Sequence, residues 1–494
     1  MNISGLKSYG MPACLLVLSF LSFQFNLFRV TSQERFDTFQ LDSEGLILDG
    51  IVHHRLVSSA SSLGHFRRAV PDTQAFLNDR EHMDRVQDAR PFLPYLSQFG
   101  LQYHVFDFLH SKCHLSVQQL EAVASLLMSL IVVGYFIALR RIVPTMAALG
   151  FCLAIALSPW TVYFARNLFW VEATWFLPCL VTLFLGNRRL TSANQLVLAL
   201  LLFIATLIKF LCGYDFITTV CLAALVPLAY YHAKYSSGVK VVVRQLGFAS
   251  LAMFLAFACA IGLHLAFLNG LASSPNDAAS VSGAAKSTDI DNGGLALILR
   301  TAEKRLYSRD PDKTANEVCR DASGDGTIDP ACVSLYEKSL KSNVLPVVAR
   351  YFVFPHMVPW VDIFDVQESN KTVLRSVLSS VKGKRFTEAL YFTAQFHGST
   401  LLSKIMFLTL NVLVAYALYR RKRLSDLLWL GIAFAAPLSW YVVAKGYSEI
   451  HTHLCYVLWY LPYIPVAITL LLCEYSKYRM NKVRVPLRRA DKYV

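Results

Sequence analysis

The sequence predicts an all-α integral membrane protein of about ten transmembrane helices, with two long outward-facing loops that carry interfacial helices. Of its 494 residues, 55% are hydrophobic and 16% are charged, and the mean hydropathy is +0.43. Soluble domains carry nearer to about 25% charged residues. Several apolar runs reach the roughly 20 residues that a helix needs to cross a bilayer. Clusters of Lys and Arg stand at alternate ends of these runs, as the positive-inside rule requires.

Each apolar run long enough to cross a bilayer is taken as one span, with boundaries uncertain by a few residues. The spans are placed at 11–30, 117–139, 143–162, 168–186, 193–212, 215–233, 246–268, 399–419, 424–443 and 453–473. The first run follows Lys7 and has no Ala-x-Ala cleavage site, which indicates a retained span rather than a signal peptide.

The orientation follows from the basic residues. All five even-numbered spans end in them, at Arg140-Arg141, Arg188-Arg189, Lys234 to Arg244, Arg420 to Arg423 and Lys477 to Lys492. Basic residues gather on the cytoplasmic side, so we expect both termini to be cytoplasmic. The net charge of +14 is explained by these span ends and predicts no nucleic-acid partner.

The spans divide the chain into three parts. An N-terminal membrane module covers 1–268 and includes an outer loop at 31–116; a second outer loop covers 269–398; a C-terminal membrane module covers 399–494. Amphipathic stretches within the outer loops predict helices along the membrane surface, or, for the stretch at 94–102, an interfacial helix or a re-entrant segment. They lie at 94–102, 344–364 and 373–396.

An acidic pair, Asp42-Ser43-Glu44, follows the first span. On an extended segment, residues two apart point the same way, so both carboxylates would face one substrate. A carboxylate fixed at the water–lipid boundary can take a proton from an acceptor hydroxyl. The competing interpretation is that these are ordinary solvated acids of a loop.

Several cations lie at the outer ends of spans, against the positive-inside trend. They are Arg166, Lys209, Lys445, His451 and His453. Binding of a lipid-linked phosphate would explain cations kept there. Alternatively, Lys209 snorkels to the interface and Arg166 pairs with Glu172 or Asp215. The two late histidines could also bind zinc, but no third ligand is near in the sequence.

The second outer loop contains a segment similar to the first nine positions of an EF-hand calcium loop. Its oxygen-bearing residues are Asp321, Ser323, Asp325, Thr327 and Asp329. Position 12 is Cys332 rather than Glu, so the match is incomplete. The alternative is a polar turn closed by a disulfide between Cys319 and Cys332. In either case a structural role is expected, with Ca²⁺ as the candidate ion.

No nucleotide-binding motif occurs, which favours a lipid-borne substrate for an outward-facing enzyme. The chain resembles the GT-C superfamily of membrane glycosyltransferases, which includes protein mannosyltransferases, aminoarabinose transferases of lipid A and dolichyl-phosphate-mannose-mannosyltransferase-like proteins. The resemblance rests on the multi-span layout, on Asp42-Ser43-Glu44, and on Ser158-Pro159 to Arg166-Asn167 between the third and fourth spans.

The resemblance implies an inverting transfer of a sugar from a polyprenyl-phosphate donor to a glycan, lipid or protein of the cell envelope, with no cofactor needed for catalysis. Asp42 or Glu44 would be the general base, and Arg166, Lys209, Lys445, His451 and His453 would contact the donor phosphate. The expected location is a bacterial inner membrane, with the active site facing the periplasm or exterior.

Two rival functions stay open. A transporter or flippase of a lipid-linked or anionic substrate would carry charges inside the spans, where Glu172 is the clearest acid. An O-antigen polymerase or ligase would favour paired arginines in outer loops instead of an early acidic pair.

Overall fold

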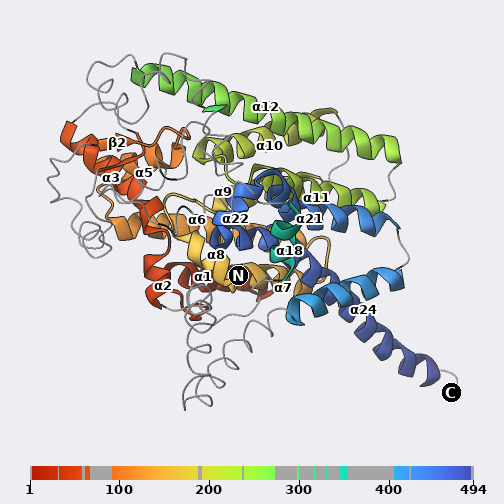
Figure 1. The fold of residues 1–494 in the computed structure, drawn as a ribbon. Helices are drawn as coiled ribbons and strands as arrows, with labels where there is room; N and C mark the ends of the chain where they lie inside the picture. The colour runs from red at the N-terminus through yellow and green to blue at the C-terminus, as the bar shows by residue number, and fades with distance from the viewer. Residues whose placement is uncertain are drawn as a thin grey trace, which may run out of the picture.

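The computed structural model is mostly helical (Figure 1). It describes nine stretches of the chain and a few single residues between 298 and 333. The stretches are 3–31, 33–57, 62–66, 92–186, 192–235, 238–272, 344–353, 405–421 and 424–490. The calcium-like segment 321–329, the Cys319–Cys332 pair and the amphipathic stretch 373–396 lie outside these residues.

The first apolar helix, α1 (Ile3–Phe25), packs on α6 (Val117–Leu139). α6 begins at a capping box, in which the side chain of Ser116 accepts from the Gln119 N–H and the Gln119 side chain accepts from the Ser116 N–H. Hydroxyl groups also join the helices, since Ser125 donates to the Gln24 side chain at 2.9 Å. Such interhelical hydrogen bonds stabilise apolar helices that pack inside a membrane.

The segment expected to be one straight span over 143–162 is broken. It forms α7 (Thr145–Ala156) and α8 (Pro159–Ala165), which are bent by 65°. Ser158 starts the second helix, because its side chain accepts from the Thr161 N–H at 3.3 Å. Pro159 stands at the first helical position, where its missing N–H costs nothing. The bend turns the chain just before Arg166.

Five further helices pack into a bundle that includes helices from both of the membrane modules predicted from the sequence. The helices are α9 (Ala173–Leu185), α10 (Ser192–Cys212), α11 (Ile217–Tyr235), α12 (Val239–Ala272) and α21 (Leu424–Val443). α11 packs along α21, and α10 packs along α12, which lies at one edge of the molecule in Figure 1. Thr219 donates to the Ala436 carbonyl at 2.9 Å, so a hydrogen bond crosses between the N- and C-terminal modules.

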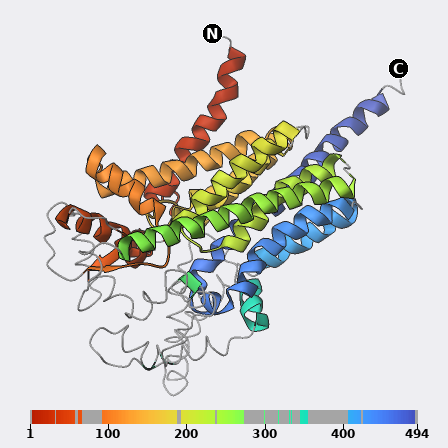
Figure 2. The same ribbon diagram turned by 90° about the horizontal axis from the view of Figure 1, so that it is seen from above.

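The last predicted span, 453–473, overlaps one candidate crossing, Tyr456–Arg479, which begins as a 3-10 helix and continues as an α-helix. After α21 the chain makes three short pieces, α22 (Lys445–Ile450), α23 (Thr452–Cys455) and η2 (Tyr456–Tyr460). The long α24 (Tyr463–Ala490) follows and packs against α7. Figure 2 shows its end projecting beyond the bundle.

Five helices of the described residues are long and apolar enough to cross a membrane. The bent pair α7–α8 would make a sixth, and two shorter apolar helices lie at Gly10–Phe25 and Ala173–Leu185. The five are Val117–Leu139, Ala193–Cys212, Val239–Gly270, Asp426–Val443 and Tyr456–Arg479. An all-α, multi-pass membrane protein is therefore supported, while the count of ten spans stays a prediction.

Basic span ends meet at one end of the bundle. The Arg141 guanidinium, after α6, lies 5.4 Å from the ring centre of Phe184 on α9. Lys234, at the end of α11, donates to the Ile142 carbonyl at 3.4 Å. Arg421 closes the helix over residues 405–421 and pairs with a carboxylate of α24.

The segment between α1 and α6 folds into short elements packed together. They are α2 (Gln33–Thr38), α3 (Leu41–Val57), β1 (Gly64–Phe66), β2 (Phe92–Pro94) and α5 (Leu101–Cys113). β1 and β2 pair antiparallel, with Gly64 opposite Pro94. The interfacial helix expected at 94–102 is therefore wrong in its bounds: this stretch is the end of β2, a turn and the start of α5. Of the expected surface stretch 344–364, the structure describes α18 (Val344–Val353).

Gly100 fixes the turn before α5. Its φ is +76°, a left-handed conformation that residues with a Cβ rarely adopt. Its N–H donates to the Leu211 carbonyl at 3.0 Å, which ties α5 to the end of α10. A Cβ at this position would also collide with the side chain of Leu63. Glycine at position 100 therefore holds the start of α5 against the end of α10.

Candidate functional site

The acidic pair lies on a helix, which corrects the expectation of an extended segment. Asp42 and Glu44 stand in the first turn of α3. Successive helical residues are rotated by roughly 100°, so residues two apart point to nearly opposite sides. Accordingly, Asp42 is exposed, whereas Glu44 is only 3% exposed. The two carboxylates do not face one substrate together.

Glu44 contacts the turn that carries Arg166. Its Oε1 accepts from the Leu168 N–H at 3.4 Å, across 124 positions of sequence. Leu168 itself is fully buried. The acidic helix and the turn after α8, which the sequence singled out separately, thus lie against each other.

Arg166 makes an ion pair, but with neither of the partners expected from the sequence. Its Nη2 lies 3.0 Å from Asp37 Oδ1 and donates to the Phe36 carbonyl at 2.9 Å. The guanidinium carbon is 3.9 Å from the ring centre of Phe36, within cation–π range. Glu172 and Asp215 were the expected partners. The side chain of Arg166 is 13% exposed, and its other N–H groups have no partner among the described residues.

Asn167 shapes the turn between α8 and α9. Its Oδ1 accepts from the N–H groups of Phe169 and Trp170 at 3.0 and 3.3 Å. Val171 then adopts φ +38°, an unusual value for a β-branched residue, which marks local strain. On α5, Gln102 donates to the Phe169 carbonyl at 2.9 Å. Hydrogen bonds within the turn, and one from Gln102 on α5, therefore stabilise its conformation.

Glu172 ends this turn and is the least solvated acid of the site. It is 0% exposed, and both carboxylate oxygens lack a hydrogen-bond partner among the described residues. It precedes α9 without capping it. A buried carboxylate without a donor or cation is costly and commonly functional inside membranes. The sequence signal was an acid standing between Trp170 and Trp175 in an apolar run.

Lys209 does not snorkel toward an interface. It is 2% exposed near the end of α10, and its Nζ donates to the Gly213 carbonyl at 2.7 Å. This bond fixes the loop before α11, in which Phe216 has φ +62°. Phe216 stacks on Trp170 with ring centres 6.0 Å apart. The loop that Lys209 holds therefore packs against the Arg166 turn.

The late cations come from α22 and its end. Lys445 and His451 are half-buried, and the His451 ring lies 4.5 Å from that of Tyr447. The ring centres of Tyr447 and Phe216 are 6.5 Å apart, which places α22 beside the aromatic cluster formed by Phe216 and Trp170. The side chain of His453 lies outside the described part of the structure. Among the described side chains, no three His, Cys, Asp or Glu residues could hold a metal ion together.

The site thus combines one exposed acid, two buried acids and a partly engaged arginine around a strained, aromatic turn. Glu44, Arg166 and the Lys209 loop are brought together through the turn and Phe216, whereas Asp42 stands exposed on the side of α3 away from Glu44. Comparison with protein-family models, with curated proteins and with solved structures gives no match for this chain.

Proposed function

We propose that this protein is an inverting membrane glycosyltransferase that uses a polyprenyl-phosphate sugar and modifies a glycan, lipid or protein of the cell envelope. One observation supports this most: Glu44 contacts the Leu168 N–H while Asp37 pairs with Arg166. Two segments more than a hundred positions apart thereby set carboxylates beside a cation. Acid–base chemistry on an acceptor next to a phosphate leaving group needs this combination.

Asp42 is the better candidate for the general base. It is exposed at the start of α3, on the side of the helix away from Glu44, so an acceptor hydroxyl would reach it from the surroundings of the protein and not from the Leu168 contact. The acceptor oxygen attacks the anomeric carbon, the bond to the phosphate oxygen breaks, and the phosphate leaves with the electron pair. Asp42 takes the hydroxyl proton, and a single base suffices because inversion needs no covalent intermediate. Glu44 is engaged by a backbone N–H and acts as a positioning residue.

Arg166 would bind the leaving phosphate. Its Nη2 is used by Phe36 and Asp37, while the rest of the guanidinium offers N–H donors in the fork that suits phosphate oxygens. Lys445 and His451 approach the same aromatic cluster from α22 and would add positive charge. Lys209 would act through the loop that it holds.

The site would face the periplasm or exterior of a bacterial inner membrane. The support for this orientation is the positive-inside rule, because Arg141, Lys234 and Arg421 gather at the end of α6 and α9 remote from Glu44. Both termini would then be cytoplasmic.

The test is donor turnover by the full chain in nanodiscs. The protein is incubated with a panel of radiolabelled polyprenyl-phosphate sugars, and released polyprenyl phosphate is measured. We expect release by the wild type and by Ser43→Ala, the matched control on the same helical turn. Asp42→Asn should release none while its thermal unfolding is unchanged. Full release by Asp42→Asn would overturn the role of this base.

The environment of Glu172 supports a second candidate function, that of a proton-coupled transporter or flippase. A fully buried carboxyl without partners among the described residues is the kind of group that such proteins protonate and deprotonate in turn. Substrate uptake into proteoliposomes driven by a pH gradient, and lost in Glu172→Gln, would support transport. Donor release that persists in Glu172→Gln, without such uptake, would support the transferase.

A further inference from the structure

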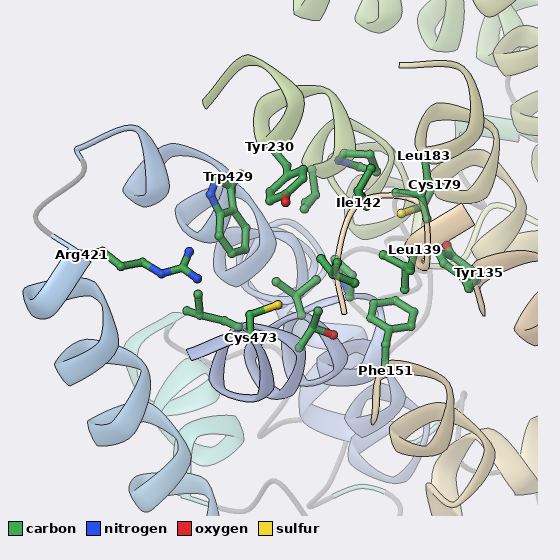
Figure 3. Close-up of a pocket in the computed structure, with 17 residues that line it drawn as sticks. Tyr135, Leu139, Ile142, Phe151, Cys179, Leu183, Tyr230, Arg421, Trp429 and Cys473 are labelled. Carbon is green, nitrogen blue, oxygen red and sulfur yellow. The ribbon is translucent and has the colours of Figure 1, made fainter. Parts of the chain in front are cut away.

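A pocket lies at the far end of the bundle from the Arg166 turn. α9 starts next to Glu172, and the residues of α9 that line the pocket lie in its second half. α6 starts close to the end of α5, and the residues of α6 that line the pocket lie near its C-terminal end. The empty volume is about 690 Å³, including the part open to the surroundings. Figure 3 shows Arg421, Trp429 and Cys473 on one side of this space and Tyr135, Leu139 and Phe151 on the other.

Apart from the Tyr230 hydroxyl, which has no hydrogen-bond partner among the described residues, the polar groups of the walls are engaged. Tyr135 donates to the Phe176 carbonyl at 2.9 Å, and Thr469 donates to the Pro465 carbonyl at 2.8 Å. Trp429 donates from its Nε1 to Asp426 at 3.2 Å. An apolar cavity of this kind stays dry and binds apolar ligands. A sugar or nucleotide would lose its hydration there and find few hydrogen-bond partners in return.

The charge of Arg421 is also already compensated. It lies 2.6 Å from Glu474 and 3.3 Å from Asp426, and Lys477 is 3.0 Å from the same Glu474. Two cations therefore face two carboxylates at this side of the pocket. This side would not hold an anion.

The opposite rim carries cations that no carboxylate compensates among the described residues. Lys234 donates to the carbonyl of Ile142, a wall residue. Arg141 is exposed and lies against Phe184, next to the wall residue Leu183. A lipid whose chain enters the pocket would bring its phosphate to this rim. Lysine and arginine near a bilayer surface attract such phosphates.

We propose that the pocket binds one hydrocarbon chain of a phospholipid from the leaflet at the basic end of the bundle, with its phosphate held by Arg141 and Lys234. Helices from both membrane modules form the walls, since Cys179 lies on α9 and Val466 on α24. The bound chain would therefore join the two modules. This site is separate from the proposed donor site and does not depend on the transferase function.

The test uses nanodiscs of phosphatidylglycerol doped with a phospholipid that carries a diazirine near the end of one chain. After illumination, labelled peptides of the full chain are mapped by mass spectrometry. We expect labels on wall residues such as Trp429 and Cys473, above those on Leu251, which is exposed on α12. Labelling of the walls no stronger than that of Leu251 would overturn the proposal.

Filling the pocket separates a bound chain from random contact. Val466→Trp and, independently, Cys473→Phe should lose the label on Trp429. Tyr475→Trp, an exposed position on the same helix α24, should keep it. Replacing both Arg141 and Lys234 by Gln should abolish any preference for phosphatidylglycerol over phosphatidylcholine in competition. Wall labels that survive both filling variants would contradict a chain inside the pocket.

Discussion

The contact between Glu44 and Leu168 gives the sharpest stability prediction. Glu44 is 3% exposed, and its Oε1 is the acceptor of the Leu168 N–H at 3.4 Å. Glu44→Ala leaves that buried N–H without its acceptor, which costs about 1–3 kcal/mol. Glu44→Gln keeps an acceptor oxygen at the same place and should cost less. The order of stability should therefore be wild type, then Gln, then Ala.

Thermal unfolding followed by tryptophan fluorescence measures this order, because Trp160, Trp170 and Trp175 lie in and around the turn. Ser43→Ala is the matched control, since within the described part of the chain the Ser43 hydroxyl donates only to the half-buried Gln40 side chain, at 3.0 Å. It should unfold close to the wild type. If Glu44→Ala unfolds at the wild-type temperature, or if Gln and Ala lower it equally, the hydrogen bond does not hold α3 to the turn.

Three further predictions follow from named contacts. Arg166→Lys should keep the charge opposite Asp37 but lose the guanidinium fork, so we expect weaker donor binding in a filter assay; unchanged affinity would exclude a bidentate phosphate contact. Burial lowers the pKa of His104, with Asp107 opposing this and His54 adding to it. The folded state thus disfavours the charged imidazolium form of His104. The unfolding temperature should therefore fall as the pH drops below 6.5, the ordinary pKa of histidine, and it should fall less in His104→Gln. Parallel pH profiles of the two proteins would contradict this. Gly100→Ala should lower the free energy of unfolding by about 1–2 kcal/mol through the left-handed conformation alone, as measured by thermal unfolding. An unchanged unfolding temperature would show that the backbone of this turn can change its conformation to accept a Cβ.

Hydropathy located several long helices well. The predicted spans 117–139 and 424–443 coincide with α6 and α21, because uninterrupted apolar runs between polar ends leave little choice of boundary. The span predicted at 246–268 is part of a longer helix, Val239–Ala272, since basic residues continue the helix beyond the apolar run. Hydropathy indicates which part of a helix can cross a membrane, but it does not indicate where the helix ends.

Helix breaks were harder to predict from hydropathy. The apolar run over 143–162 conceals the break at Ser158-Pro159, because the capping pattern there is local and does not lower the hydropathy of the run. The next predicted span, 168–186, contains the turn that ends at Glu172, because buried aromatic turns are as apolar as helices. The ends of helices depend on local hydrogen bonds, which an averaged hydropathy does not measure.

For the candidate site, the sequence suggests which residues to consider, but it does not reveal which of them pair. Asp42, Glu44 and Arg166 were singled out by type and place, and their segments do contact one another. The Asp37 partner of Arg166 lies 129 positions away, and nothing in the local sequence marks it. The opposite directions of Asp42 and Glu44 follow from helix α3, which the motif alone did not reveal.

The most direct measurement of the central claim is whether the purified protein consumes a lipid-linked sugar at all. Wild-type protein in nanodiscs is given a polyprenyl-phosphate sugar panel and, separately, nucleotide sugars, and the fate of each donor is followed. We predict release of polyprenyl phosphate from at least one lipid-linked donor and no consumption of nucleotide sugars. If every lipid-linked donor stays intact while pH-driven uptake is observed in proteoliposomes, the protein is a transporter and the transferase account is wrong.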